Sequence, residues 1–420
     1  MRRIALSGLV AAAVVLGCSV SALAGTTGHS VAPAAAVADA ARAASATWTS
    51  GDGIGKGNQV SCASTTSCLA VGDDVNSRGN LVPIAESLHA GTWKAVSTTK
   101  APGYSALTSE LTGVSCKAAT YCLAVGQYDS ISLGTTPYAM TWNGNTLAAV
   151  VKLPLPSTDY LSALGPVSCL AVKSCVVFGS GPDISLSSSG NPVVAVYAWT
   201  WNGSKWSLSA TPVSGNELAI INSARCFSPK SCVLAGSTTP LLGSASTITP
   251  LLVTWNGKSL TGMNPIVPSD MKQAEFVSVS CSATTSCAAT GVDLKGNDAS
   301  AFLDVTDGKG WNLTKWGGPS GATSAALTGV SCVSRSNCVA AGGIDTAKTS
   351  LAAALTWNGT KWTVTKVPGP GTGKMSIFYG VSCSAAGNCT AIGETGKATA
   401  EVGSQFAGHW SGSAWKLTAA

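Results

Sequence analysis

The amino-acid sequence predicts an all-β chain of seven similar units. Two phrases carry this prediction, and each returns seven times in constant order. The first is a cysteine pair with five residues between the partners, as in "GVSCSAAGNCTAIGE" from Gly380. The second is a tryptophan-containing turn, as in "TWNGTKW" from Thr356. Successive first cysteines are 54, 53, 57, 55, 51 and 51 residues apart, which gives a repeat length of about 53 residues.

Each unit reads as four short strands. The residues before the first cysteine and after the second form two strands joined by turn formers such as "SATTS". A third strand ends at Asn-Gly, which favours a tight hairpin in which both turn positions take positive φ. The fourth, as in "KWTVTKVP", alternates polar with apolar residues, as an exposed edge strand does. Because no amphipathic helical pattern separates the units, the sequence predicts a seven-bladed β-propeller of four-stranded antiparallel blades.

The cysteine spacing predicts one hairpin disulfide per blade. Positions flanking a short hairpin loop lie opposite each other with Cα atoms roughly 4.5 Å apart, within reach of a disulfide. Redox motifs space cysteines two apart, and zinc sites need converging pairs, usually with histidine. The chain has only His29, His89 and His409, so no metal or other cofactor is expected. The predicted pairs are Cys62–Cys68, Cys116–Cys122, Cys169–Cys175, Cys226–Cys232, Cys281–Cys287, Cys332–Cys338 and Cys383–Cys389.

The N-terminal segment predicts export. Residues 1–24 read as a signal peptide, with "MRR", an apolar run and "ALA" before the cleavage point. Residues 25–46 form an Ala-rich linker that we expect to be disordered, and residues 47–420 the propeller, with units starting near 59, 113, 166, 223, 278, 329 and 380. Alternatively "VLGC" is a lipobox and Cys18 is lipidated. Both interpretations place the chain outside the cytoplasm, where disulfides persist. Whether ring closure uses "TWTS" at Thr47–Ser50 stays open.

The repeated phrases "VSC-x5-C-x-A-x-G" and "WNG-x-x-W" resemble those of secreted, cysteine-stapled β-propellers common among actinobacterial proteins. The resemblance spans about Thr47 to Ala420, and it implies export and a propeller but no particular reaction. The turn phrase is also distantly similar to those of Asp-box and kelch-type propellers. "TDGKGW" from Thr306 comes nearest to the Asp-box pattern, although it is one residue short before the glycine.

The absence of a catalytic constellation favours a monomeric binding module over an enzyme. Charged residues make up 10%, and the formal charge of +6 is too small and too scattered along the chain to indicate nucleic acid. Sialidase-type catalysis needs three arginines around a carboxylate, which the chain cannot assemble from Arg42, Arg78, Arg225 and Arg335. Serine-hydrolase, phosphate-loop and His-Glu metal motifs are absent. A polysaccharide hydrolase or lyase remains the alternative.

Candidate ligand-binding residues follow the glycine that ends the second strand. They are Asp73, Asp74, Asp129, Asp183, Asp293 and Asp345, and Glu394 shares this placement. The variable loops Asp73–Pro83, Tyr128–Pro137, Asp183–Pro192 and Val292–Ala299 are expected on the same face. Such loops on a rigid ring commonly carry recognition, so we expect a glycan or protein ligand there. Alternatively the acids only keep the loops soluble. The repeated tryptophans suit packing between blades, or stacking on sugars.

Overall fold

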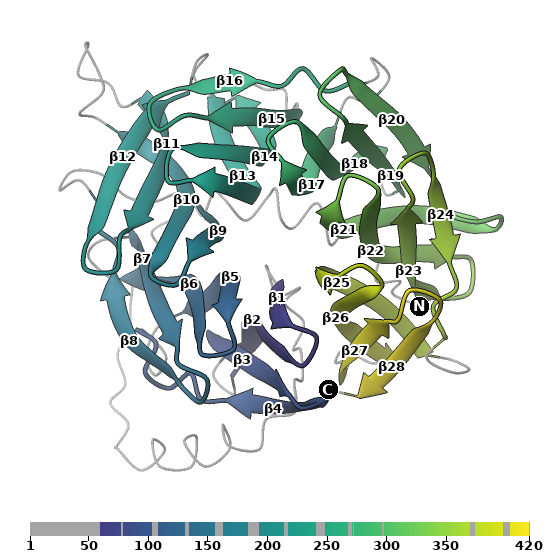
Figure 1. Cartoon of the computed structure of the whole chain (residues 1–420), viewed down its shortest axis with the longest axis horizontal. Helices are drawn as coiled ribbons and strands as arrows, with labels where there is room; N and C mark the ends of the chain where they lie inside the picture. Colours follow the sequence, from purple (N-terminus) through teal and green to yellow (C-terminus); the bar gives the residue numbers. More distant parts are fainter. Residues whose placement is uncertain are drawn as a thin grey trace, which may run out of the picture.

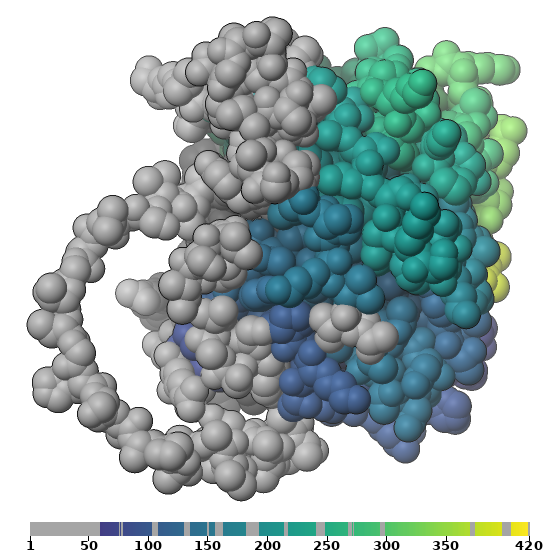
Figure 2. Space-filling view, turned by 90° about the vertical axis from the view of Figure 1, so that its left-hand side faces the viewer, coloured from purple at the N-terminus to yellow at the C-terminus, as the bar shows by residue number. Residues whose placement is uncertain are grey.

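A computed structural model describes residues 59–76, 79–102, 108–130, 134–155, 163–183, 193–213, 217–240, 248–267, 271, 273–295, 298–369, 374–397 and 404–419. This part of the chain forms 28 strands in seven four-stranded antiparallel sheets. Figure 1 shows the sheets as blades around one axis, with the first strand of each blade innermost and the fourth outermost. Viewed from the side, the described blades make a thick disc (Figure 2). The predicted propeller is confirmed.

The strands follow the repeat in order. Blades 1 to 3 comprise β1 (Gln59–Ser64), β2 (Ser67–Val75), β3 (Leu81–His89), β4 (Thr92–Val96); β5 (Ser109–Ala118), β6 (Tyr121–Ser130), β7 (Gly134–Trp142), β8 (Leu147–Lys152); β9 (Ala163–Ala171), β10 (Ser174–Asp183), β11 (Val193–Trp201), β12 (Trp206–Pro212). Blades 4 and 5 comprise β13 (Glu217–Ser228), β14 (Ser231–Pro240), β15 (Thr249–Trp255), β16 (Leu260–Gly262); β17 (Ala274–Ala283), β18 (Ser286–Lys295), β19 (Asp298–Thr306), β20 (Trp311–Trp316). Blades 6 and 7 comprise β21 (Ala322–Ser334), β22 (Asn337–Thr346), β23 (Ser350–Trp357), β24 (Trp362–Thr365); β25 (Lys374–Ala385), β26 (Asn388–Lys397), β27 (Ser404–Trp410), β28 (Trp415–Ala419).

All seven predicted disulfides are present, one in each blade. Each joins residues that are direct register partners of the first and second strands, as Cys62 and Cys68 are in blade 1. The Cα atoms lie 3.9–4.0 Å apart, somewhat closer than the generic hairpin spacing predicts. A loop this short stabilises its blade by roughly 2 kcal/mol in the chain-entropy picture.

The glycine at the end of "C-x-A-x-G" lies opposite a bulge in the innermost strand. In blade 7 the bulge leaves Tyr379 as an extra residue next to Gly393. A Cβ at Gly393 would overlap the carbonyl oxygen of Ile377, so only glycine fits. The same overlap with an inner-strand carbonyl occurs at Gly126, Gly236, Gly291 and Gly342. The repeated glycine is therefore a packing requirement, because the bulge brings two backbones together.

The Asn-Gly turns differ from the expected two-residue hairpin. Four residues, 202–205, connect Trp201 and Trp206, and within Asn-Gly only Gly203 has positive φ, at 92°. The Oδ1 atom of Asn202 accepts the backbone N–H groups of Ser204 and Lys205 at 3.0 Å each. The prediction that both residues take positive φ is wrong, because the asparagine shapes this longer turn through its side chain.

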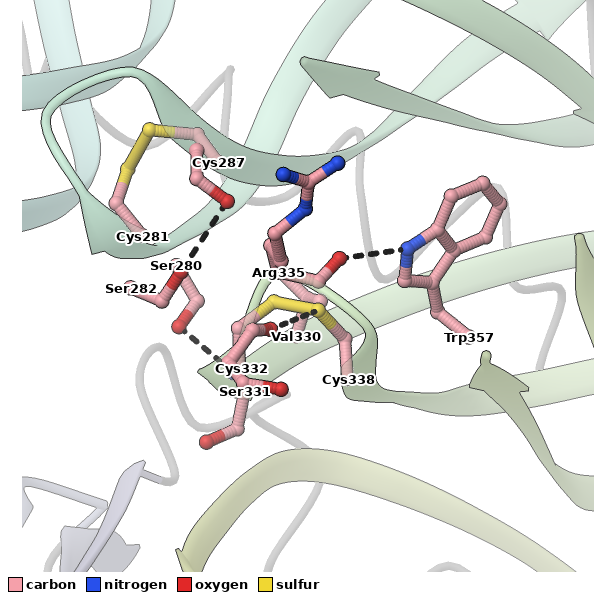
Figure 3. Close-up of a disulfide and its surroundings, with 12 residues drawn as sticks. Ser280, Cys281, Ser282, Cys287, Val330, Ser331, Cys332, Arg335, Cys338 and Trp357 are labelled. Carbon is pink, nitrogen blue, oxygen red and sulfur yellow. Dashed lines mark hydrogen bonds between the residues drawn. A yellow bond between two sulfur atoms is a disulfide. The ribbon is translucent and has the colours of Figure 1, made fainter. Parts of the chain in front are cut away.

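The serine before each first cysteine joins neighbouring blades. The innermost strand is an edge of its sheet, so the backbone N–H groups on its free side have no partner within the blade. At six of the seven interfaces, a serine Oγ accepts the N–H of the next blade's first cysteine at 2.9–3.0 Å. Figure 3 shows this serine latch between Ser280 and Cys332. The pairs are Ser61–Cys116, Ser115–Cys169, Ser168–Cys226, Ser280–Cys332, Ser331–Cys383 and Ser382–Cys62.

The interface between blades 4 and 5 departs from this pattern. Arg225 replaces the serine, and its Nε donates to the carbonyl oxygen of Cys281 at 3.2 Å. Two positions earlier, the Oγ of Ser223 accepts the N–H of Val279 at 3.0 Å and donates to its carbonyl at 3.3 Å. This interface therefore keeps a backbone connection through Ser223, as the next interface does through Ser278 and Val330 at 3.2 Å, but it lacks the serine bond to the first cysteine.

The hydrophobic core is divided among the interfaces between blades. One cluster, for example, packs Leu69 and Val71 of blade 1 against Leu111 and Met140 of blade 2. Small residues of the second strands fit this crowded position, as Ala124, Ala235 and Ala289 do with no exposed surface.

Among the described residues, the ring closes without exchange of strands between blades 1 and 7. Blades 1 and 7 each consist of four consecutive strands (Figure 1). The latch from Ser382 to Cys62 closes the ring, and Ile392 packs against Val60 and Ala70. The segment Thr47–Ser50, the signal peptide, the linker and Cys18 lie outside the described residues.

Candidate functional site: the loop face

The antiparallel blades give the disc two faces made from different turns. The cysteine face carries the turns between first and second strands and between third and fourth strands. The loop face carries the loops between second and third strands and the connections between blades. The predicted acidic residues follow the second strand's glycine, so all of them lie toward the loop face.

These acids do not form one cluster. Asp73 and Asp74 belong to blade 1, Asp129 to blade 2, Asp183 to blade 3, Asp293 to blade 5 and Asp345 to blade 6. Asp73, Asp293 and Asp345 are buried, with exposed fractions of 5%, 1% and 7%, whereas Asp129 is exposed. Asp183 ends β10, and its side chain lies outside the described residues. The sequence predicted that these acids share one face, and in the structure they are distributed around that face over five blades.

Two of the acids bind the other strand of their own hairpin. The Oγ of Ser350 donates to Oδ1 of Asp345 at 2.5 Å, and these residues are register partners of β22 and β23. Thr135 Oγ1 likewise donates to Oδ1 of Asp129 at 3.3 Å across β6 and β7. Both contacts order a loop-face hairpin, so these carboxylates shape the loops on which they lie.

A tyrosine–carboxylate contact lies at the interface between blades 7 and 1. The hydroxyl of Tyr379, the bulge residue of β25, donates to Oε2 of Glu394 at 2.7 Å. Burial, together with the charges of Glu394 and of Asp73 from blade 1, raises the pKa of Tyr379 well above its ordinary value. The phenol therefore stays protonated at neutral pH and can donate a hydrogen bond, but it is poorly suited to act as a nucleophile.

A second buried acid lies between blades 4 and 5. Glu275 on β17 is 2% exposed, and its Oε2 accepts hydrogen bonds from Asn222 Nδ2 at 3.3 Å and Ser237 Oγ at 3.4 Å. Burial raises the pKa of Glu275 to about 7, because desolvation outweighs these two bonds. Asn222 also donates to the carbonyl of Phe276 at 2.9 Å, so this bulge residue connects the two innermost strands.

A third polar contact connects blades 2 and 3. Gln127 follows the second-strand glycine of blade 2, and its Nε2 donates to Oε1 of Glu110 at 2.6 Å. Its Oε1 accepts the N–H of Leu164 from β9 at 3.1 Å. One amide side chain therefore joins its own innermost strand to that of the next blade.

These three contacts use two repeat positions, the bulge residue and the residue after the second-strand glycine. We call them the seam positions. The bulge residues are Thr112, Asn222, Val277, Thr328 and Tyr379. The residues after the glycine are Asp73, Gln127, Ser180, Ser237, Val292, Gly343 and Glu394. The sequence analysis named Asp73, Glu394 and, as the start of a loop, Val292, but it missed the others, although aligning the repeats on their cysteines shows that both positions vary.

One further buried acid lies within blade 5. Asp304 has no exposed surface, and its Oδ2 accepts the N–H of Ile266, from the connection between blades 4 and 5, at 3.1 Å. Burial raises the pKa of Asp304 to about 7. Both acids whose pKa rises to about 7 therefore belong to blade 5 and contact blade 4 or the segment that follows it.

The repeated tryptophans pack inside the hairpins and between blades. Trp201 and Trp206 are cross-strand partners with ring centroids 5.2 Å apart. Trp357 Nε1 donates to the carbonyl of Arg335 in the cysteine turn at 3.0 Å (Figure 3). Trp255, 2% exposed, donates to Thr211 Oγ1 of the preceding blade at 3.2 Å. These contacts give the four rings a role in packing.

Within the described ranges, no three His, Cys, Asp or Glu side chains converge as a metal site would require. The same ranges contain no helix with the length and apolarity to cross a bilayer.

No protein-family model and no curated protein sequence matches this chain. Three solved structures with similar folds are the β-propeller domain of the Trilobed protease from Pyrococcus furiosus, the BP39L lectin from Burkholderia pseudomallei, and YCF48 bound to D1 peptide. The first has 7% identity and a TM-score of 0.49 over 87% of this chain and 95% of its own. The lectin has 11% identity and a TM-score of 0.49, and the match covers 86% of this chain and 98% of the lectin. YCF48 has 15% identity and a TM-score of 0.46, and the match covers 81% of this chain and 90% of YCF48. Similarity at this level concerns the strand arrangement and carries no information on ligand or reaction.

Proposed function

We propose that this protein is an extracytoplasmic binding module that holds a glycan or protein ligand on its loop face. Seven disulfides fit an oxidising compartment, and the signal-peptide or lipobox pattern at residues 1–24 supports export. A single closed ring supports a monomer.

The observation that carries the proposal is the contrast between the two halves of each blade interface. Toward the cysteine face, the same serine–cysteine bond recurs at six interfaces. Toward the loop face, the seam positions hold hydroxyl, amide, carboxyl, phenol and apolar side chains in no repeating order. A scaffold needs constant residues, whereas varied seams support loops that differ from blade to blade, as recognition of an irregular ligand needs.

The test measures binding to an array of glycans and cell-wall polymers, with a hydrolysis screen of the same polymers beside it. Asp74→Asn with Asp129→Asn removes two charges from the loop face, and Asp307→Asn is the control on the cysteine face. On uncharged polymers we expect the double variant to weaken binding about tenfold or more, and the control to leave it unchanged. Equal binding by all three proteins would contradict a loop-face site.

A polysaccharide hydrolase or lyase is the alternative. Glu275 favours it, because a carboxyl with its pKa raised to about 7 is protonated enough to act as a general acid. Its 2% exposure and its bonds to Asn222 and Ser237 argue for a structural role. Turnover of any polymer that is lost in Glu275→Gln, while the fold is kept, would establish the alternative.

A further inference from the structure

The excess of cations over acids in this chain lies in the turns of the cysteine face. The fourteen turns of that face, all of them described, contain seven cations and a single acid, Asp307. The cations are Lys173, Lys205, Lys230, Lys258, Lys309, Arg335 and Lys361. Seven less one gives these turns a formal charge of +6, which equals that of the whole sequence. The rest of the chain holds eighteen cations and eighteen acids and is neutral.

Sequence order hides this arrangement, because consecutive cations lie tens of residues apart. The fold places them at equivalent turns of blades 3 to 6, which are neighbours in the ring (Figure 1). Within blade 3 the two turns abut, since a Cβ at Gly203 would lie 3.1 Å from the Cβ of Lys173. Lys205 belongs to that same turn, so two ammonium groups share one blade end. Blade 4 repeats this with Lys230 against Gly257, next to Lys258.

These cations are exposed and held on rigid turns. All seven side chains are exposed, and none forms an ion pair with an acid of the described residues. An asparagine or aspartate side chain fixes each of the four outer turns, as Asn358 does by accepting the N–H of Thr360 and of Lys361 at 3.0 Å each. Nearer the axis, burial and then the positive charge of Arg225 lower the pKa of Lys117, so further cations border the arc.

We propose that this basic arc binds a linear anionic polysaccharide, with carboxylate groups along its chain. Blades 3 to 6 each present one lysine at the outer turn, namely Lys205, Lys258, Lys309 and Lys361, which forms a curved row for a flexible polyanion. Lysines predominate, and their compact charges suit attraction without bidentate geometry. Among described residues, only Val172 is a large exposed hydrophobic side chain on this face, which disfavours insertion into a lipid bilayer. The site is separate from the ligand site proposed on the loop face.

The test uses the full mature chain and polygalacturonate in a binding titration. The arc variant carries Lys205→Ser, Lys258→Ser, Lys309→Ser and Lys361→Ser, and other repeats already hold small or polar residues in these turns. The matched control carries Lys100→Ser, Lys348→Ser, Lys366→Ser and Lys374→Ser, which removes the same charge from exposed loop-face positions. Melting curves verify that both variants fold.

We expect the wild type to bind at 50 mM salt and to lose about tenfold or more of its affinity by 200 mM. The arc variant should lose about tenfold or more at low salt, and the control about twofold or less. Equal losses in the two variants, or no binding by the wild type, would overturn the proposal. Binding to phosphatidylglycerol vesicles but not to polygalacturonate would also overturn it and assign the arc to a membrane surface. The loop-face substitutions Asp74→Asn and Asp129→Asn test the other site independently.

Discussion

The interface between blades 4 and 5 and the other six interfaces join the innermost strands of neighbouring blades through different residues. At six of them one serine hydroxyl accepts one cysteine N–H, and the six distances from N to Oγ differ by at most 0.1 Å. The seventh uses Arg225, Ser223 and Asn222, and it encloses Glu275. The comparison teaches that the ring tolerates replacement of its latch when other side chains reach across. It also shows that the buried acids whose pKa rises to about 7 belong to the exceptional region.

The largest effect should come from a feature that both regions share, the glycine opposite the bulge. Gly291→Ala in blade 5 and Gly342→Ala in blade 6 would each drive a Cβ into inner-strand atoms. We expect each to lower the free energy of unfolding by about 3 kcal/mol or more. Gly369→Ala, where no atom lies within 4 Å, is the control and should change it by less than about 1 kcal/mol. Denaturant titrations measure all three, and a tolerated alanine at either bulge would contradict the packing argument.

A pH dependence should distinguish the exceptional region. The pKa of Glu275 is raised in the folded chain to about 7, so the folded state keeps a proton that the unfolded state releases. Its stabilising contribution is present below pH ~4 and is lost as the pH rises through ~7, by about 3 kcal/mol. Asp304, with its pKa also raised to about 7, acts in the same direction.

Unfolding titrations at pH 4.5, 6 and 8 test this dependence. The variants Glu275→Gln and Asp304→Asn should each flatten the profile, whereas Glu217→Gln on the loop face should not. A profile that stays equally steep in both of the first two variants would show that other groups set the pH dependence.

The sequence predicted the repeated architecture because the repeat itself is visible. The cysteine spacing and the repeated tryptophan turn together were sufficient to predict the number of blades, their strand order and every disulfide. It was not sufficient to predict the role of Ser280 and its equivalents, because their partners lie in the next blade, about 50 residues away. The four-residue turn at Asn202 was also missed, since the dipeptide alone does not give the loop length.

The site was less predictable than the fold. Asp129 and Asp345 were identified from their distance to a glycine, and their contacts turned out to lie within single hairpins. The contacts of Tyr379 and Glu275 depend on bulges whose positions no single residue type indicates in the sequence. The basic arc depends on which turns share a face, which becomes clear only after the blades are closed into a ring.

A smaller effect is expected from one latch. Ser280→Ala leaves the N–H of Cys332 without its acceptor at the interface between blades 5 and 6. We expect a loss of about 1 kcal/mol in the free energy of unfolding, because one partly buried hydrogen bond is removed. Ser282→Ala, two residues further along the same strand, is the control. A loss no larger than that of the control would show that the serine contributes nothing across the interface.

The most direct test of the serine latch is hydrogen exchange at the N–H groups of the seven first cysteines. Six of these amides meet a serine Oγ, whereas Cys281 faces Arg225, which engages its carbonyl instead. The latch predicts that the Cys281 amide exchanges about fivefold faster than the other six, and that Arg225→Ser brings it to their rate. Uniform exchange at all seven cysteines in the wild type, with no change in Arg225→Ser, would contradict it.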